Sequence, residues 1–424
     1  MLGRSTGIAV GYDLSNKYAQ ISYISSSDDS GKTVSNIPGS EEYNMPLCLF
    51  KRSEVNQWFV GRETVGYSTT EEGAIVDRLW ERALLGEDVT VAEDTFDPIA
   101  LLGLYVKRSM AYLYAEVDKK DIKGIMFTVP SLTKRAIEVL EMISTSFVDA
   151  GISVGFQGRD ESIFYYTIKQ PQELWQYDTF VFDYEDGVIN TYRFNINKRT
   201  KPYVAFVDNV DETNLSAELS YDELDNTFLD IVRNTTDGHI VTCAYLLGEG
   251  FSGDWCKESL RELCRNRRAF RGNNLYSRGA CYAMQERLQR EDGSRNIVFL
   301  GKDKLRANVG MNVIRCREQS YLALLNGGDN WFDSRVSKEM ILDKGNSVNL
   351  VITPLDGRNV KEVTVVLEGL AEREPMATRI RVETIMESQS TLRINVTDLG
   401  FGEFYPATNQ VFTKQIQLED NTGL

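Results

Sequence analysis

The stretch "IAVGYDLSNKYAQISYI", from Ile8 to Ile24, has a counterpart far along the chain, "FVFDYEDGVINTYRFNI", from Phe180 to Ile196. Each consists of an apolar run, an aspartate (Asp13 or Asp183) at the start of a polar turn, and then an alternating apolar and polar run. Alternation with a period of two is typical of strands, so each stretch is predicted to form a strand-turn-strand hairpin. Two such hairpins indicate a duplicated domain with a cleft between its halves.

Composition indicates an ordinary globular protein of two or three domains. The 424 residues include 47 Lys and Arg against 62 Asp and Glu, which gives a net charge of −15. This charge opposes unspecific binding to nucleic acid and to anionic membranes. No window approaches the ~18 uninterrupted apolar residues of a membrane span. The N-terminal segment has the pattern of a strand and not of a signal peptide, and the six cysteines show no CxxC spacing. We therefore expect a cytoplasmic protein.

Two local features point to no specific chemistry. The chain has a single histidine, His239, which leaves little room for triad or zinc chemistry. The basic stretch "RNRRAFRG", which begins at Arg265, is interpreted as a helix end with solvated arginines.

The order of the predicted elements indicates a mixed α/β body followed by a β domain. Strands and helices alternate through "DPIALLGLYVKRSMAYLYAEV", "DIKGIMFTVP" and "SLTKRAIEVLEMISTSFVDAGI", and again after the second hairpin. After about residue 296 the chain alternates apolar and polar residues between short turns, which predicts an all-β sandwich. The predicted domains are residues 1–178, 179–295 and 296–424.

This order of elements resembles the actin-like ATPase superfamily, and in detail the DnaK-type seventy-kilodalton heat-shock chaperones. The segments that carry the resemblance are "GYDLSNKYAQISYI", "IKGIMFTVPSLTKRAIEVLEMISTSFVDAGI", "GRDESIFYYTI", "TFVFDYEDGVINTYRF", "AYLLGEGFSGD" and "SRGACYAM". The tail "RIRVETIMESQSTLRINVTDLGFGEF" is similar to the end of the chaperones' β-sandwich substrate domain. The resemblance implies a bilobal fold of two ribonuclease-H-like halves, the second of them shortened, with a β-sandwich domain appended.

The resemblance also implies where functional residues would lie. Glu161 takes the place of a catalytic-site glutamate, and Asp183 that of the aspartate of the second phosphate hairpin. ATP with Mg²⁺ would be the cofactor. The positions that match nucleotide- and phosphate-binding residues of the family are Asp13, Ser15, Asn16, Lys17, Gly187, Gly248 and Gly250.

Several of these positions depart from the family's pattern. In the first loop the family has glycine and hydroxyl residues, where this chain has Ser15, Asn16 and Lys17. The second loop has lost all but one of its glycines, and Glu185 and Asp186 now stand where phosphates would lie. Two like charges at ~4 Å repel by about 4 kcal/mol at an effective dielectric of 20. These carboxylates therefore oppose phosphate binding.

Two further departures affect the catalytic centre and the adenine. The family's catalytic lysine falls near Asp77 and Arg78, and an arginine does not reproduce the geometry of an ammonium group. The interval from Gly187 to Gly248 is less than half as long as in the chaperones, and it lacks the subdomain that clasps the adenine.

The sequence therefore predicts a degenerate DnaK-like and actin-like protein without catalysis or a cofactor. It would bind another protein or a peptide through its β domain and serve as a scaffold. Three alternatives stay open: a divergent ATP hydrolase, a filament-forming relative, and a lidless chaperone that holds peptides weakly. Asp13 and Asp183 could also simply cap their own turns. In a further variant, Asp13, Asp183, Glu185 and Asp186 face one cleft and bind a hard cation without nucleotide.

Overall fold

The computed structural model describes residues 7–418 except 26–27, 38, 54, 92, 200–201, 217, 290–296 and 356–358. The chain divides into two compact units, Met1–Phe299 and Leu300–Leu424. The first is a mixed α/β unit and the second is β-rich, as the sequence predicts. The domain boundary predicted at 295–296 lies outside the described residues and stays a prediction. No helix in the described part of the chain is both long and apolar enough to cross a membrane.

The first hairpin forms the centre of the first large sheet. Strands β1 (Ile8–Leu14) and β2 (Tyr18–Ser25) pair antiparallel, and β1 also pairs in parallel with β10 (Ile122–Val129). Tyr12, Phe127 and Leu14 are fully buried, which explains the long apolar runs on these strands. In spatial order the main path of the sheet is β11 (Ser153–Gly158), β10 (Ile122–Val129), β1 (Ile8–Leu14), β2 (Tyr18–Ser25) and β3 (Asp28–Thr33).

The second hairpin forms the centre of the second large sheet in the same way. Strands β12 (Asp178–Glu185) and β13 (Val188–Asn197) pair antiparallel, and β12 pairs in parallel with β15 (Val241–Leu247). In spatial order the strands are β16 (Arg268–Arg271), β15 (Val241–Leu247), β12 (Asp178–Glu185), β13 (Val188–Asn197), β14 (Tyr203–Asn214) and β17 (Ile297–Phe299). Both sheets therefore contain three consecutive antiparallel strands continued by two parallel strands, so the topology is repeated.

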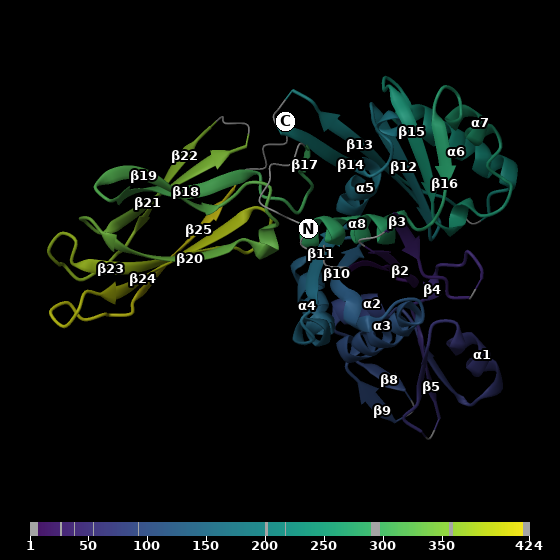
Figure 1. Cartoon of the computed structure of the whole chain (residues 1–424), viewed down its shortest axis with the longest axis horizontal. Helices are drawn as coiled ribbons and strands as arrows, with labels where there is room; N and C mark the ends of the chain where they lie inside the picture. Colours follow the sequence, from purple (N-terminus) through teal and green to yellow (C-terminus); the bar gives the residue numbers. More distant parts are fainter. Residues whose placement is uncertain are drawn as a thin grey trace, which may run out of the picture. The chain divides into compact units, whose positions relative to one another are not determined.

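Two helices lie between the sheets (Figure 1). Helix α5 (Arg159–Ile168) leaves the first sheet after β11 and contacts β13 and β14 of the second. Helix α8 (Leu275–Gln289) follows β16 of the second sheet and contacts β1, β2, β3 and β10 of the first. A Cβ atom on Gly279 of α8 would lie 2.1 Å from the carbonyl oxygen of Ser162 in α5. Glycine at this position therefore permits the two helices to cross closely.

Other helices cover the outer faces and start where their caps predict. Asp97 caps α3 (Pro98–Tyr114), Thr133 caps α4 (Lys134–Asp149), and Ser220 forms a capping box with α6 (Tyr221–Thr236). The remaining helices and strands of this unit are β4 (Met45–Pro46), β5 (Leu49–Arg52), β6 (Trp58–Val60), α1 (Glu63–Thr70), β7 (Gly73–Val76), α2 (Leu79–Leu85), β8 (Val89–Val91), β9 (Asp94–Phe96) and α7 (Glu258–Leu263).

The basic stretch that begins at Arg265 differs from its interpretation as a helix end. Helix α7 ends at Leu263, and after a short turn Arg268–Arg271 forms strand β16, which pairs in parallel with β15. Tyr245 of β15 stacks on Phe270 with ring centroids 5.6 Å apart. This packing, together with the ladder to β15, explains why the stretch is extended and not helical.

The second unit contains two four-stranded antiparallel sheets (Figure 1). Burial alternates along their strands, as in Leu392, Ile394 and Val396, so each sheet has one face in the core. The first sheet comprises β19 (Glu318–Leu325), β18 (Ala307–Arg315), β21 (Ser347–Pro354) and β22 (Lys361–Val366). The second comprises β20 (Arg335–Leu342), β23 (Thr378–Met386), β24 (Thr391–Gly400) and β25 (Val411–Gln417).

Candidate functional site

The structure brings the two hairpin aspartates together at one buried arginine. Asp13 lies near the end of β1 and Asp183 near the end of β12, and Arg159 is the first residue of α5. Its guanidinium lies with Nη1 at 3.3 Å from Asp183 Oδ2 and Nη2 at 3.6 Å from Asp13 Oδ2. The Arg159 side chain is only 7% exposed. The three side chains form a buried cluster that we call the Arg159 centre.

Two more residues complete the Arg159 centre. Arg159 Nη1 lies 3.5 Å from Oε2 of Glu185 at the end of β12. The hydroxyl of Tyr276 in α8 donates to Asp183 Oδ2 at 2.7 Å, and its ring stacks under the guanidinium at 4.4 Å from Cζ to the centroid. The arginine thus contacts both hairpins and one crossing helix, and a cation–π contact adds to its ion pairs.

The electrostatics of the centre follow from burial and mutual charge. Burial alone would lower the pKa of Arg159, but the carboxylates of Asp13 and Asp183 raise it above its ordinary value. Burial raises the pKa of Asp13 to about 6, although Arg159 opposes the shift. Burial, reinforced by Asp13 and Asp186, raises the pKa of Glu185 to about 8. One fixed positive charge is therefore shared among more carboxyl groups than it can neutralise.

The first turn uses its own polar groups internally. The Ser15 hydroxyl donates to the carbonyl of Tyr18 at 2.8 Å and accepts from the backbone N–H groups of Tyr18 at 3.0 Å and of Lys17 at 3.3 Å. Asn16 lies exposed at the tip. The backbone N–H groups of Ser15, Lys17 and Tyr18 are therefore already bonded within the turn.

The second turn is shorter than a phosphate loop. Glu185 pairs with Val188 across the hairpin, so the loop consists of Asp186 and Gly187, with φ of 53° and 77°. Positive φ at both positions matches a two-residue hairpin turn of the Asp-Gly type. Asp186 forms an ion pair with Lys17 of the first turn. The Lys17 side chain, which could have met phosphate, thus connects the two hairpins instead.

The glycines of the adenosine-like motif are explained by packing. Gly248 has φ of 92°, and a Cβ atom there would lie 2.4 Å from the carbonyl oxygen of Tyr184. A Cβ atom on Gly250 would lie 2.3 Å from the Tyr184 ring. Both glycines are therefore required for β15 and the turn after it to pack against β12.

Two further positions that the resemblance singles out are Glu161 and Arg78. Glu161 is buried in the first turn of α5, where a carboxylate is favoured by the helix dipole. Arg78 is exposed and donates from Nε to Glu81 at 2.6 Å, so it does not stand in for a catalytic lysine.

The residues present do not fit the Mg²⁺ ion that the family resemblance implies. A cation near Asp13 and Asp183 would meet the Arg159 guanidinium, and like unit charges at ~4 Å repel by about 4 kcal/mol at a dielectric of 20. In the described part of the chain no group of three or more His, Cys, Asp or Glu residues is arranged to hold a metal ion. The four-carboxylate cation site stays a prediction; in the structure Arg159 lies among three of these carboxylates, and Asp186 pairs with Lys17.

Sequence reasoning missed Arg159 and Tyr276. Arg159 stands in "GRDES", beside the glutamate that the resemblance singled out, but an arginine at a helix start carries no signal that it turns inward. Its position among three carboxylates depends on the approach of the two hairpins, which no local pattern encodes.

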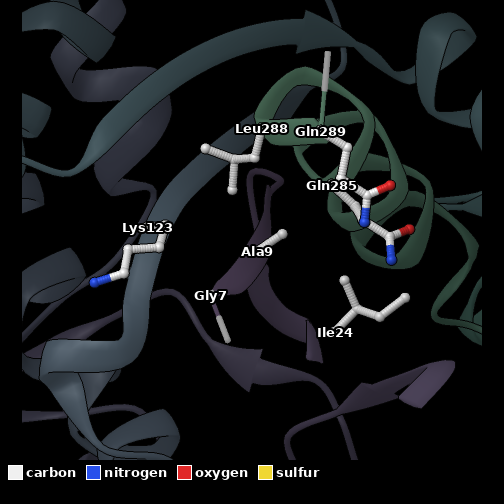
Figure 2. Close-up of a pocket in the computed structure, with 7 residues that line it drawn as sticks. All are labelled: Gly7, Ala9, Ile24, Lys123, Gln285, Leu288 and Gln289. Atoms are coloured by element: carbon white, nitrogen blue, oxygen red, sulfur yellow. The ribbon is translucent and has the colours of Figure 1, made fainter. Parts of the chain in front are cut away.

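A cavity lies near the other end of β1, away from the Arg159 centre (Figure 2). Its volume is about 190 Å³, and its lining consists of Gly7, Ala9, Ile24, Lys123, Gln285, Leu288 and Gln289. The Lys123 ammonium donates to the Lys120 carbonyl at 3.0 Å, and in Figure 2 it points away from the other labelled side chains. The cavity therefore presents no pair of titratable groups for catalysis.

Comparison with known protein families gives two matches. Residues 30–302 match the model described as "Family of unknown function (DUF5716) C-terminal". Residues 304–418 match the "Domain of unknown function (DUF8552)". No curated protein matches the chain. Because the first match covers more than half of the chain, the protein belongs to the family of unknown function DUF5716.

Proposed function

We propose that this protein is a degenerate actin-like and DnaK-like protein of the cytoplasm that has lost ATP turnover and acts as a protein-binding scaffold. The single observation that carries the proposal is the position of Arg159. Its guanidinium lies between Asp13 and Asp183, where the family resemblance expects phosphate and Mg²⁺. The protein would bind other proteins or peptides, and it would bind neither nucleic acid nor a membrane.

The actin-like part of the proposal is supported by the repeated topology. Each large sheet has three antiparallel strands continued by two parallel strands, as expected for two ribonuclease-H-like halves. Helices α5 and α8 cross between the sheets, and each contacts the sheet that it does not follow. This arrangement supports a common origin with bilobal ATPases. It carries no argument about activity, because fold alone does not determine function.

Loss of nucleotide binding is supported by the contacts that the residues at the matching positions make within the protein. Arg159 forms ion pairs with both aspartates, Ser15 binds its own turn, and Gly248 packs against the backbone of Tyr184. Lys17 is already paired with Asp186, so it is not free to meet phosphate. The pKa of Glu185 lies at about 8, so near pH 7 this side chain is mostly protonated and adds little negative charge.

A protein contact through the β domain is supported by one exposed aromatic residue. Phe404 is 93% exposed on the loop between β24 and β25. Arg373 connects the two sides of this segment, because it forms a bidentate ion pair with buried Asp398 at 2.6 and 2.7 Å and donates to the Pro406 carbonyl at 3.0 Å. A large apolar side chain on a loop held in this way is a typical anchor for a partner's pocket.

Calorimetric titration of the full-length protein with ATP and Mg²⁺ tests the proposal. We expect no saturable heat with ATP and Mg²⁺, and none with the cation alone. Saturation at micromolar ATP would overturn the loss of nucleotide binding. Titration of a protein with its phosphate site intact, such as a DnaK-type chaperone, controls for the sensitivity of the measurement.

A divergent ATPase is the second candidate, and one specific observation favours it. Oδ1 of Asp13 and Oδ1 of Asp183 are buried without a hydrogen-bond partner among the described residues. Buried carboxylate oxygens usually have partners, so these two oxygens could serve a ligand. In that case Arg159 would have to turn toward phosphate, and the same titration would detect the binding.

A further inference from the structure

Strand β16 is the outer strand of the second large sheet. Its residues Arg268–Arg271 pair in parallel with Cys243–Leu246 of β15, and β15 pairs with β12 on its other side. Within the described residues no strand pairs with the outer edge of β16. An outer edge presents a row of backbone N–H and C=O groups that an additional strand can pair with.

The edge of β16 is held firmly from inside the sheet. Phe270 stacks on Tyr245 with 23° between the rings, and the N–H of Gly272 donates to the Leu246 carbonyl at 3.1 Å. Phe270 is nevertheless 40% exposed, so it offers apolar surface beside the backbone groups. A strand that docks here would meet a preorganised edge and would pay little ordering cost on this side.

Charge makes this edge unusual in a protein with a net charge of −15. Arg265, Arg268 and Arg271 are exposed, and none of them forms an ion pair with another described residue. The nearby glutamates are already engaged, since Glu258 pairs with Arg261 and Glu262 lies 3.8 Å from a nitrogen of Arg267. Strand β16 and the turn before it therefore carry exposed arginines without ion pairs on an acidic protein, although Arg271 donates to the Gly253 carbonyl at 3.3 Å.

The same arginines disfavour the pairing of β16 with a second copy of itself. Charged residues on an edge strand oppose pairing with a second copy of that strand, because like charges would stand opposite each other. They favour a strand of opposite charge by the same physics. Arg271 also lines a pocket with Glu41, Glu42 and Glu249, so the attraction for acidic residues is strongest toward Arg265 and Arg268.

We propose that β16 binds an extended acidic segment of a partner protein, which adds as a further strand to this sheet. Backbone hydrogen bonds to the free edge would give affinity, and acidic side chains beside Arg265 and Arg268 would give specificity. The inference deepens the proposed protein-binding role and rests on it. It adds a second contact surface on the α/β unit, separate from the Arg159 centre.

The test is binding of a fluorescein-labelled peptide of alternating glutamate and valine to the full-length protein, followed by fluorescence anisotropy. We expect saturable binding that weakens as salt rises. The double variant Arg265→Glu, Arg268→Glu should lose affinity by about tenfold or more. The double variant Arg315→Glu, Arg317→Glu changes the net charge equally in the other unit and should bind as the wild type does.

A second peptide separates strand addition from simple charge attraction. N-methylation at alternate residues removes backbone donors but keeps every side-chain charge, and it should abolish binding. Equal affinity for the methylated peptide, or for single-stranded DNA of the same charge, would overturn the proposal. If ATP binds while the peptide also binds as expected, the proposed loss of nucleotide binding fails and this inference stands.

Discussion

The two hairpins of the α/β unit are alike in their strands and different in their turns. Each places a buried aspartate near the end of its first strand, and each aspartate faces Arg159. The first turn keeps three residues between its strands and bonds them through Ser15, whereas the second is reduced to Asp186 and Gly187. The strands and aspartates therefore form the part that the two hairpins share, and the turns are the part in which they differ.

The largest expected effect comes from removing the Arg159 guanidinium, which contacts both hairpins. Arg159→Met should destabilise the protein by about 3–5 kcal/mol, because it leaves buried carboxylates without a countercharge. Urea unfolding followed by circular dichroism measures the change. Arg78→Met, at an exposed arginine paired with Glu81, is the matched control and should leave the midpoint nearly unchanged.

A combined variant sharpens this result. Adding Asp13→Asn and Asp183→Asn to Arg159→Met removes the charges that the arginine neutralised, so part of the lost stability should return. If the single variant is as stable as the Arg78 control, the two hairpins do not depend on Arg159 for stability.

The next effect tests the helix crossing that both halves share. Gly279→Ala places a methyl group against the Ser162 carbonyl, where the Cβ distance would be 2.1 Å, and should destabilise by about 1–3 kcal/mol. Gly66→Ala in α1 has no atom within 4 Å of the added Cβ and should stabilise by about 0.5–1 kcal/mol. Thermal unfolding of the two variants should therefore move in opposite directions; parallel shifts would contradict the crossing.

A pH effect distinguishes the second turn from the first. The pKa of Glu185 is raised from its ordinary value of 4.5 to about 8, so the folded state holds this proton more tightly than the unfolded state. Its stabilising contribution is complete below about pH 4.5 and is lost as the pH rises through about 8. Glu185→Gln should remove this part of the slope and be the more stable protein above pH 8. Urea unfolding across that range measures the difference, and identical slopes would contradict it.

The smallest effect concerns the ion pair that connects the two turns. Lys17 and Asp186 are both well exposed, so Lys17→Ala should cost only about 0.2–1 kcal/mol. High salt should reduce the difference, because screening weakens exposed pairs. Urea unfolding at low and high salt measures it. A loss comparable to that of Arg159→Met would mean that the turns, and not the buried centre, hold the halves together.

Most strands and helices of this fold could be predicted from the sequence. The hairpins alternate clearly, and Asp97, Thr133 and Ser220 are capping residues that mark where helices begin. Strand β16 was missed because its arginines resemble a solvated helix end, and only the ladder to β15 makes it extended. Arg159 was missed because its partners lie on strands far apart in sequence. Local patterns predict elements, but charge neutralisation between elements depends on the assembled fold.

We propose that Arg159 occupies the place of phosphate and Mg²⁺, and an experimental structure determined with saturating ATP and Mg²⁺ tests this proposal. We expect Arg159 to keep its contacts with Asp13 and Asp183, with no nucleotide between the two turns. A structure in which phosphates lie between the turns, with the Arg159 guanidinium turned away from the aspartates, would contradict it.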